Sequence, residues 1–525
     1  MLTICLPVKS PLPMVFHLAR RWSRACAALI VGTFFLQVAS AQTSDEGEIL
    51  QTDLPNIVFI FTDDLGYGDI GAFGATDVAT PHIDSLATNG AKFTQFYSIS
   101  PVCSPSRAGL LTGRNPIRMG IHEAFFPSGY LGMPQSEITI PEALRPAGYA
   151  SAIIGKWHLG HHRQYLPLQQ GFDEYFGIAY SNDMVPLPLF RGNDVVAPDV
   201  DQSQLTKLLT EEAADFIDRS ADQPFFLLLA HPMPHVPIYA SAAFENVSER
   251  GSYGDVIEEL DWSVGEVLAA LDRNNLTDNT LVVFSSDNGP WLVMGDEGGS
   301  NGGLRNGKGT TFEGGVRVPT LAQMPGRIAP GRIIDTPLSM LDWLPTFAAM
   351  AGVEKPENIV IDGRDLTPVL QQNTGGADDR VLAFYAHGNL EAIRIGDWKY
   401  KREFDASTLG VPGALRFILG EEYGFKSHGP LLFNLADDPG EKTNLIRKHP
   451  EKAEELSAAL ADFESEMGDV PGSITKIDLA MSPAIGVLLK TIFKYALMAI
   501  SLLLIIIAAA FFFLGRWLGL RKAKS

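Results

Sequence analysis

The chain has 525 residues, of which 46% are hydrophobic, and its formal net charge at pH 7 is −20. Residues 1–41 carry four positive charges and residues 484–525 carry six, and neither segment has a negative charge. The net charge of residues 42–483 is therefore −30. Such an acidic body excludes nonspecific binding to nucleic acid, and an anionic substrate must be attracted by local cations. Its length is more than one compact core usually needs, so we expect two domains.

The first 41 residues have the pattern of a cleavable export signal. Three arginines precede an apolar stretch at 27–36, and the small residues Ala39-Ser-Ala41 follow it. We therefore expect the mature protein in the periplasm or on the extracellular side. Two of the three cysteines lie in this segment, so Cys103 is the only cysteine expected in the mature chain and no intramolecular disulfide can form.

Four apolar runs are typical of buried parallel strands, and polar residues follow each of them. We predict an α/β fold with a large, mostly parallel or mixed sheet sandwiched by helices. The carboxyl ends of parallel strands meet at one edge of a sheet, so the residues after them should share a crevice. The runs are 56–62 before Asp63 and Asp64, 149–154 before Lys156 and His158, 224–230 before His231 and His235, and 280–285 before Asp287 and Asn288.

Cys103 lies in the segment Pro101-Val-Cys-Ser-Pro-Ser-Arg-Ala-Gly-Leu-Leu-Thr-Gly113. Pro105 and Gly113 predict the start and end of a short helix, with Cys103 at its N-terminus. Most free cysteines are small buried hydrophobic residues. Here the helix N-terminus and Arg107, one turn along, both favour an anion, which indicates a chemical role instead.

The acidic residues at two strand ends predict a cation site. Asp63 and Asp64 alone would more often form a turn or a helix cap. A second pair, Asp287 and Asn288, at another strand end makes a metal site as probable as a turn. Three carboxylates and one amide oxygen are hard ligands, so Ca²⁺ or Mg²⁺ fits better than Zn²⁺, and Ca²⁺ is preferred for an exported protein.

The glycine-rich stretch 302–315 resembles a P-loop but departs from it at Gly309, where a Ser or Thr should bind Mg²⁺. We interpret Lys308 as a single cation on a loop that can approach an anion closely. A flexible surface loop is the alternative.

The C-terminal part predicts a smaller α+β subdomain at 371–467, after a catalytic domain at 42–370. Residues 468–494 then have the character of a linker and interfacial segment. Residues 495–514 form an uncharged run long enough to span roughly 30 Å of hydrocarbon, which predicts a transmembrane helix rather than a buried core helix. The basic residues of 515–525 favour a cytoplasmic tail.

Two long motifs identify a family. The segment 103–113 resembles the first signature of the sulfatases, within the alkaline phosphatase superfamily, and 148–158 resembles the second. Residues 432–445 resemble the family's C-terminal subdomain, so the likeness extends from about residue 56 to about 445. The resemblance implies a sulfuric ester hydrolase of the arylsulfatase type.

The resemblance also implies roles for particular residues. Cys103 would be oxidised by a formylglycine-generating maturation enzyme, and the hydrate of the resulting aldehyde would attack the sulfur of a sulfate ester. His158 would drive sulfate elimination, and His235 with Lys308 would bind the sulfate and help to protonate the leaving oxygen. Ser181 matches a sulfate-contacting serine. Charge would be balanced by Arg107, Lys156 and Lys308, while one Ca²⁺ would be held by Asp63, Asp64, Asp287, Asn288 and the group made from Cys103.

Two other functions remain open at this stage. Relatives with the same scaffold hydrolyse phosphate mono- or diesters, and phosphoryl transfer needs a similar group of cations. Without maturation of Cys103 the protein would bind sulfated glycans without turnover. The leaving group, aryl or carbohydrate, cannot be read from the sequence.

Overall fold

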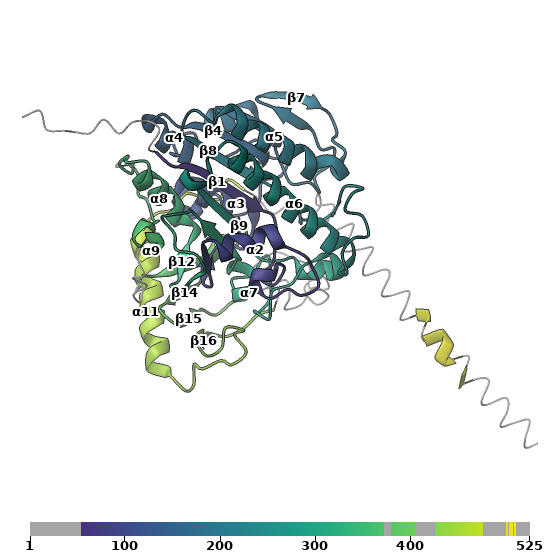
Figure 1. The fold of residues 1–525 in the computed structure, drawn as a ribbon. Helices are drawn as coiled ribbons and strands as arrows, with labels where there is room; N and C mark the ends of the chain where they lie inside the picture. Colours follow the sequence, from purple (N-terminus) through teal and green to yellow (C-terminus); the bar gives the residue numbers. More distant parts are fainter. Residues whose placement is uncertain are drawn as a thin grey trace, which may run out of the picture. The chain divides into compact units, whose positions relative to one another are not determined.

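The computed structural model describes residues 54–356, 358–371, 380–405, 426–475, 500–501, 503–507 and 509–510 (Figure 1). The predicted signal at 1–41 lies outside these residues, as does the part of the predicted linker from 476 to 494. The strands are β1 (Asn56–Thr62), β2 (Ala91–Phe93), β3 (Phe96–Tyr97), β4 (Ala150–Lys156), β5 (Glu174–Ile178), β6 (Leu189–Arg191), β7 (Asp194–Ala197), β8 (Phe225–Ala230), β9 (Thr280–Ser286), β10 (Thr320–Gln323), β11 (Arg332–Ile334), β12 (Leu338–Ser339), β13 (Leu382–Ala386), β14 (Asn389–Ile395), β15 (Trp398–Lys401) and β16 (Leu431–Asn434). The α-helices are α2 (Pro81–Thr88), α3 (Cys103–Thr112), α4 (Ile140–Leu144), α5 (Leu205–Arg219), α6 (Gly251–Arg273), α7 (Glu313–Val316), α8 (Trp343–Met350), α9 (Thr367–Gln371) and α11 (Pro450–Met467).

A ten-stranded sheet has the order β11-β2-β10-β9-β1-β8-β4-β5-β6-β7. Its centre, from β9 to β5, is parallel, and antiparallel strands lie toward both edges. The four runs expected to be parallel strands are β1, β4, β8 and β9, and they are neighbours in the sheet. The expected mixed α/β sheet is therefore present.

Alternate side chains of β1 explain why helices cover both faces of this sheet. Ile57, Phe59 and Phe61 pack into a core shared with α3, α4 and α8. Val58 and Ile60 point the other way, into a core shared with α2, α5 and α6, and Figure 1 shows α5 and α6 beside these strands. Burial of each large apolar side chain stabilises the fold by about 1.5–3 kcal/mol, so both layers hold the sheet in place.

The C-terminal part forms a four-stranded antiparallel sheet in the order β13-β14-β15-β16. Side chains of this sheet pack against α11, which matches the expected α+β composition. Lys399 of β15 is fully buried between two carboxylates, 2.9 Å from Glu313 of α7 and 3.1 Å from Glu441. This ion pair joins the small sheet to the glycine-rich segment. The domain boundary at residue 370 stays a prediction.

The predicted transmembrane helix at 495–514 is wrong. Across the described residues, the structure has no helix that is both long enough and apolar enough to cross a membrane. The expected location, anchored in a membrane with a cytoplasmic C-terminus, is corrected with it.

Candidate active site

The ends of β1 and β9 bring the acidic residues together. The strands are parallel with Thr62 opposite Ser286, so the residues that follow each strand emerge side by side. The backbone N–H of Asp64 donates to Oδ1 of Asp287 over 3.2 Å, and Nδ2 of Asn288 donates to Oδ1 of Asp64 over 2.7 Å. Asp64 has a φ of 65°, a conformation that costs a non-glycine residue energy and often marks a functional site.

Helix α3 places Cys103 against this group. Its Sγ and one carboxylate oxygen from each of Asp63, Asp64 and Asp287 all lie within 4.8 Å of one another. Burial and the charge of Asp63 raise the pKa of the Cys103 thiol well above its usual range. The expected preference for an anion at the helix N-terminus is therefore outweighed, and the unmodified side chain is a neutral thiol.

Three buried cations offset the carboxylates. Nε and Nη2 of Arg107 both donate to Oδ2 of Asp287, over 3.0 and 2.8 Å. Lys156 donates to Asp63, and Nζ of Lys308 donates to Oδ2 of Asp64 over 2.8 Å. Nζ of Lys308 also lies 3.5 Å from Sγ of Cys103, so the glycine-rich segment does bring its cation to the cysteine.

The carboxylates still differ in their affinity for protons. Burial and the charge of Asp63 raise the pKa of Asp287 to about 7. Burial, opposed by Lys308, raises the pKa of Asp64. Burial acts the same way on Asp63, but Lys156 and the other cations outweigh it and hold the pKa of Asp63 well below its usual range. Burial therefore leaves two of the three carboxylates, Asp64 and Asp287, with raised pKa values, although three cations lie beside the cluster.

His158 is oriented as a base. Its Nε2 lies 2.9 Å from the carbonyl oxygen of Phe125, which can only accept, so Nε2 carries the proton. Nδ1 is buried, and among the described residues no group bonds to it. Burial, with Lys156 and Arg107, lowers the pKa of His158 well below its usual value. The ring is neutral at pH 7, and its free nitrogen is Nδ1.

His235 and Ser181 complete the set of predicted residues. Nδ1 of His235 donates to the carbonyl of Val236, and Nε2 lies 3.6 Å from Oδ2 of Asp64. Burial and Lys308 lower the pKa of His235 to about 3. Oγ of Ser181 accepts a hydrogen bond of 3.0 Å from Lys156. His231 instead hydrogen-bonds to a residue outside the cluster: its Nε2 lies 3.0 Å from Oγ of Ser263.

The sequence did not indicate two supporting contacts. Oγ of Ser104 donates to the carbonyl of His158 over 2.7 Å and accepts from the N–H of Phe125 over 3.0 Å. It therefore fixes both the backbone and the ring partner of His158. Trp291 lies under Nζ of Lys308 at 4.6 Å and beside the His235 ring at 5.4 Å. Its position three residues after Asn288 was the only available signal.

The residues present fit a hard divalent cation. Oδ1 of Asp63 and Oδ1 of Asn288 are buried and accept no hydrogen bond from any described residue. Nη2 of Arg107 lies 3.6 Å from Oδ1 of Asp63, and buried oxygen atoms without a hydrogen bond are costly unless a cation lies beside them. Together with Asp64 and Asp287 they form an oxygen-rich set that suits Ca²⁺ or Mg²⁺.

Comparison with known proteins identifies the family. The sulfatase family model matches residues 55–353, and the model of the C-terminal region of aryl-sulfatase matches 377–491. The chain is 39% identical to N-acetylgalactosamine-6-sulfatase of Homo sapiens, covering 82% of this chain and 87% of that protein. It is 38% identical to arylsulfatase A of Homo sapiens, with 80% and 89% covered.

A solved structure agrees with these relatives. The PsFucS1 sulfatase from Pseudoalteromonas sp. superposes with a TM-score of 0.72 at 27% identity, covering 81% of this chain and 93% of that one. Sulfatases generally use a metal ion and a formylglycine, and the resemblance seen in the signatures is confirmed. The chain belongs to the sulfatase family and is a sulfuric ester hydrolase.

Proposed function

We propose that this sulfatase cleaves sulfate monoesters with a formylglycine made from Cys103 by a maturation enzyme, and with one Ca²⁺ bound beside it. The observation that carries the proposal is the position of Cys103, whose sulfur lies within 4.8 Å of carboxylate oxygens from three aspartates and 3.5 Å from Nζ of Lys308. The raised pKa of the thiol supports it, because an unmodified neutral thiol is a poor nucleophile.

The metal ion and the modified side chain at position 103 would have separate tasks. Asp63, Asp64, Asp287 and Asn288 would hold Ca²⁺, which would neutralise charge on the sulfate oxygens. A hydrated aldehyde at position 103 would supply an oxygen nucleophile and a second hydroxyl, whose deprotonation releases the sulfate.

The protein's own cations would bind the sulfate group. Nζ of Lys308 lies 3.5 Å from Sγ of Cys103 and pairs with Asp64. Burial alone would lower the pKa of Lys308, but the charge of Asp64 outweighs it and raises that pKa, so Lys308 stays charged. Lys156 bridges Asp63 and Ser181, which places a second ammonium at the cluster. Arg107 contacts Asp287, so we assign it to orienting that carboxylate and balancing its charge.

The two histidines would move protons. His158 has an unprotonated Nδ1 and a lowered pKa, so it can accept the proton whose removal releases sulfate. His235 enters the reaction neutral because its pKa is about 3 in the free protein. A sulfate ester bound beside it would raise that pKa, which lets His235 with Lys308 help to protonate the leaving oxygen.

Turnover of nitrophenyl sulfate and nitrophenyl phosphate by the matured protein tests this function. We expect kcat/KM for the sulfate to exceed that for the phosphate. The cations of the site are already paired with carboxylates, so the site suits a sulfate ester, with one negative charge, better than a phosphate monoester, with up to two. Preferred hydrolysis of the phosphate would favour the phosphoesterase alternative instead.

Calcium should stabilise the protein in a pH-dependent way. The pKa of Asp287 is about 7 in the folded protein without metal, against an ordinary value of 3.8 for an aspartate. Between these values the folded protein holds a proton that the unfolded chain does not, so this group makes the metal-free protein less stable as pH rises from about 4 to about 7. Calcium replaces that proton. The increase in Tm on adding calcium should be small at pH 4.5 and larger at pH 7.5, as measured by circular dichroism, and a pH-independent increase would contradict this assignment.

A further inference from the structure

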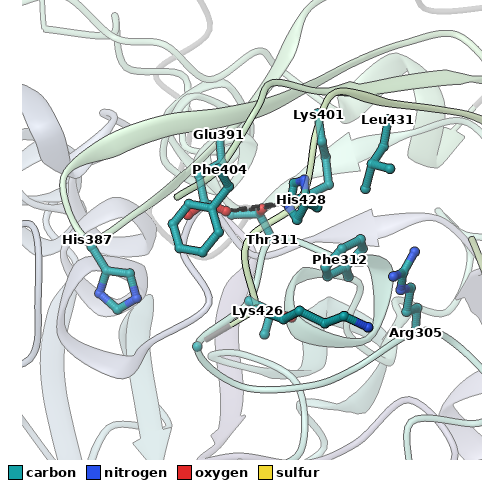
Figure 2. A pocket seen from close by; sticks show the side chains of 12 residues that line it. Arg305, Thr311, Phe312, His387, Glu391, Lys401, Phe404, Lys426, His428 and Leu431 are labelled. Atoms are coloured by element: carbon teal, nitrogen blue, oxygen red, sulfur yellow. Dashed lines mark hydrogen bonds and ion pairs between the residues drawn. The ribbon is translucent and has the colours of Figure 1, made fainter. Parts of the chain in front are cut away.

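A cavity of about 140 Å³, separate from the residues around Cys103, lies beside the loop that carries Lys308. Figure 2 shows its wall, which combines the end of the glycine-rich segment with residues from the C-terminal sheet. Its lining comes from Arg305, Gly309, Thr310, Thr311, Phe312, His387, Glu391, Lys401, Phe404, Lys426, His428 and Leu431. Segments separated by at least 75 residues in the sequence therefore meet here.

The charge of the cavity is opposite to that of the protein as a whole. Arg305, Lys401 and Lys426 line it, and Glu391 is the one carboxylate among the lining residues that the structure describes. Glu391 is already engaged, because Oγ1 of Thr311 donates to it over 2.7 Å and Nζ of Lys401 lies 3.3 Å away. In a body with a charge of −30 such a cavity attracts anions.

Two of these cations, Arg305 and Lys401, are held in place before any ligand arrives. The guanidinium of Arg305 lies 4.1 Å from the centre of the Phe312 ring and donates to the carbonyl of Glu441 over 3.0 Å. Nζ of Lys401 lies 4.5 Å from the same ring. Burial lowers the pKa of Lys401, and a bound anion would relieve that cost. Prearranged donors of this kind favour binding because little order is lost when the ligand enters.

The cavity is also close to the reacting centre. Lys308, whose Nζ is 3.5 Å from Sγ of Cys103, is followed directly by the lining residues Gly309 to Thr311. The N–H of Gly309 donates to the carbonyl of Pro101 over 2.9 Å, which ties the cavity wall to the segment that enters α3. Three residues span at most about 11 Å even when fully extended. The backbone of this cavity wall therefore lies within about 11 Å of the backbone of Lys308, a separation that a small oligosaccharide can span.

We propose that this cavity binds a second anionic group of the same substrate molecule, a carboxylate or a further sulfate. The inference rests on the proposed function and deepens it, because the substrate class becomes a polyanionic sulfated glycan. The relatives support a sugar ester, since one is named N-acetylgalactosamine-6-sulfatase. A free anion such as released sulfate has the same chemistry, so the experiment must separate the two sources.

The test compares sulfated uronic-acid disaccharides with the carboxyl-reduced forms of the same disaccharides. We expect kcat/KM to be about tenfold higher for the acidic form, as one well-placed charge pair gives. Lys426 is exposed, so Lys426→Glu should fold normally, which its melting curve checks, and should bring the two values of kcat/KM close together. Lys448→Glu is the matched control: this lysine is exposed and outside the cavity, so the tenfold ratio should persist.

Inorganic sulfate provides the second arm. Its inhibition of nitrophenyl sulfate hydrolysis should be equal in the wild type and in Lys426→Glu, because product sulfate binds at the reacting centre. If Lys426→Glu weakens that inhibition and leaves the disaccharide ratio at tenfold, the cavity serves a free anion and the proposal is wrong. Equal kcat/KM for acidic and reduced disaccharides, with nitrophenyl sulfate still cleaved, would overturn this inference alone. Failure to cleave any sulfate ester would remove the proposed function and this inference with it.

Discussion

Cys103→Ala should abolish sulfate ester hydrolysis, with kcat/KM falling by at least about 10⁴-fold, as removal of a nucleophile does in other hydrolases. The reason is that Cys103 is the residue from which the proposed nucleophile is made, and its Sγ lies among the three carboxylates and 3.5 Å from Nζ of Lys308. Initial rates with nitrophenyl sulfate measure the loss. Binding of sulfate should remain, because Lys156, Lys308 and His235 are unchanged.

The same variant should stay folded. Cys103 forms no disulfide and is 2% exposed, and the substitution removes one sulfur atom from a buried site. The free energy of unfolding should therefore change by about 1 kcal/mol. Unfolding of the variant would make the activity loss uninformative, and full activity in a folded variant would refute the role assigned to Cys103.

Asp287→Asn should lower calcium affinity and activity together, the activity by about 10³-fold or more. Asp287 accepts hydrogen bonds from Nε and Nη2 of Arg107 and from the N–H of Asp64, so the change disturbs a cation and a neighbouring ligand as well as removing a charge. Calorimetric titration with calcium and rates with nitrophenyl sulfate give the two quantities. An activity that falls with calcium affinity unchanged would remove Asp287 from the metal site.

Asp342→Asn is the matched control. Asp342 is also a fully buried aspartate bound to an arginine, Arg380, at 2.7 Å, but it lies in a different part of the fold. Asp342→Asn should lower the free energy of unfolding by about 3 kcal/mol, as the loss of other buried ion pairs does, and should leave calcium affinity unchanged. The comparison separates loss of a buried ion pair from loss of a metal ligand.

The sequence was sufficient to predict β1, β4, β8 and β9 because each has an apolar interior and is followed by polar residues that can bind a ligand or take part in a reaction. β1 and β9 show this best: burial on both faces selects their interior residues, and the parallel register places Asp63 beside Asp287. The signatures around Cys103 and His158 were long enough to indicate the family, which the comparisons confirm. The roles of the site residues stay predictions.

Other features depend on burial and on contacts between distant segments. The helix N-terminus predicted an anionic Cys103, but desolvation and Asp63 reverse that preference. The sequence pattern does not reveal the contacts of Ser104 and Phe125 with His158, because each joins a side chain to a backbone carbonyl of a distant segment. The cationic cavity likewise joins the glycine-rich segment to the C-terminal sheet. The uncharged run at 495–514 and the basic residues after it predict a membrane helix, whereas the described residues include no helix long and apolar enough to cross a membrane.

The most direct measurement is the mass of the peptide that contains Cys103, taken from protein purified from its own source and paired with an aldehyde-specific label. The proposed function predicts the exchange of sulfur and two hydrogens for one oxygen at this residue, together with labelling, in the active protein. An unmodified thiol in protein that hydrolyses sulfate esters at full rate would contradict the central claim.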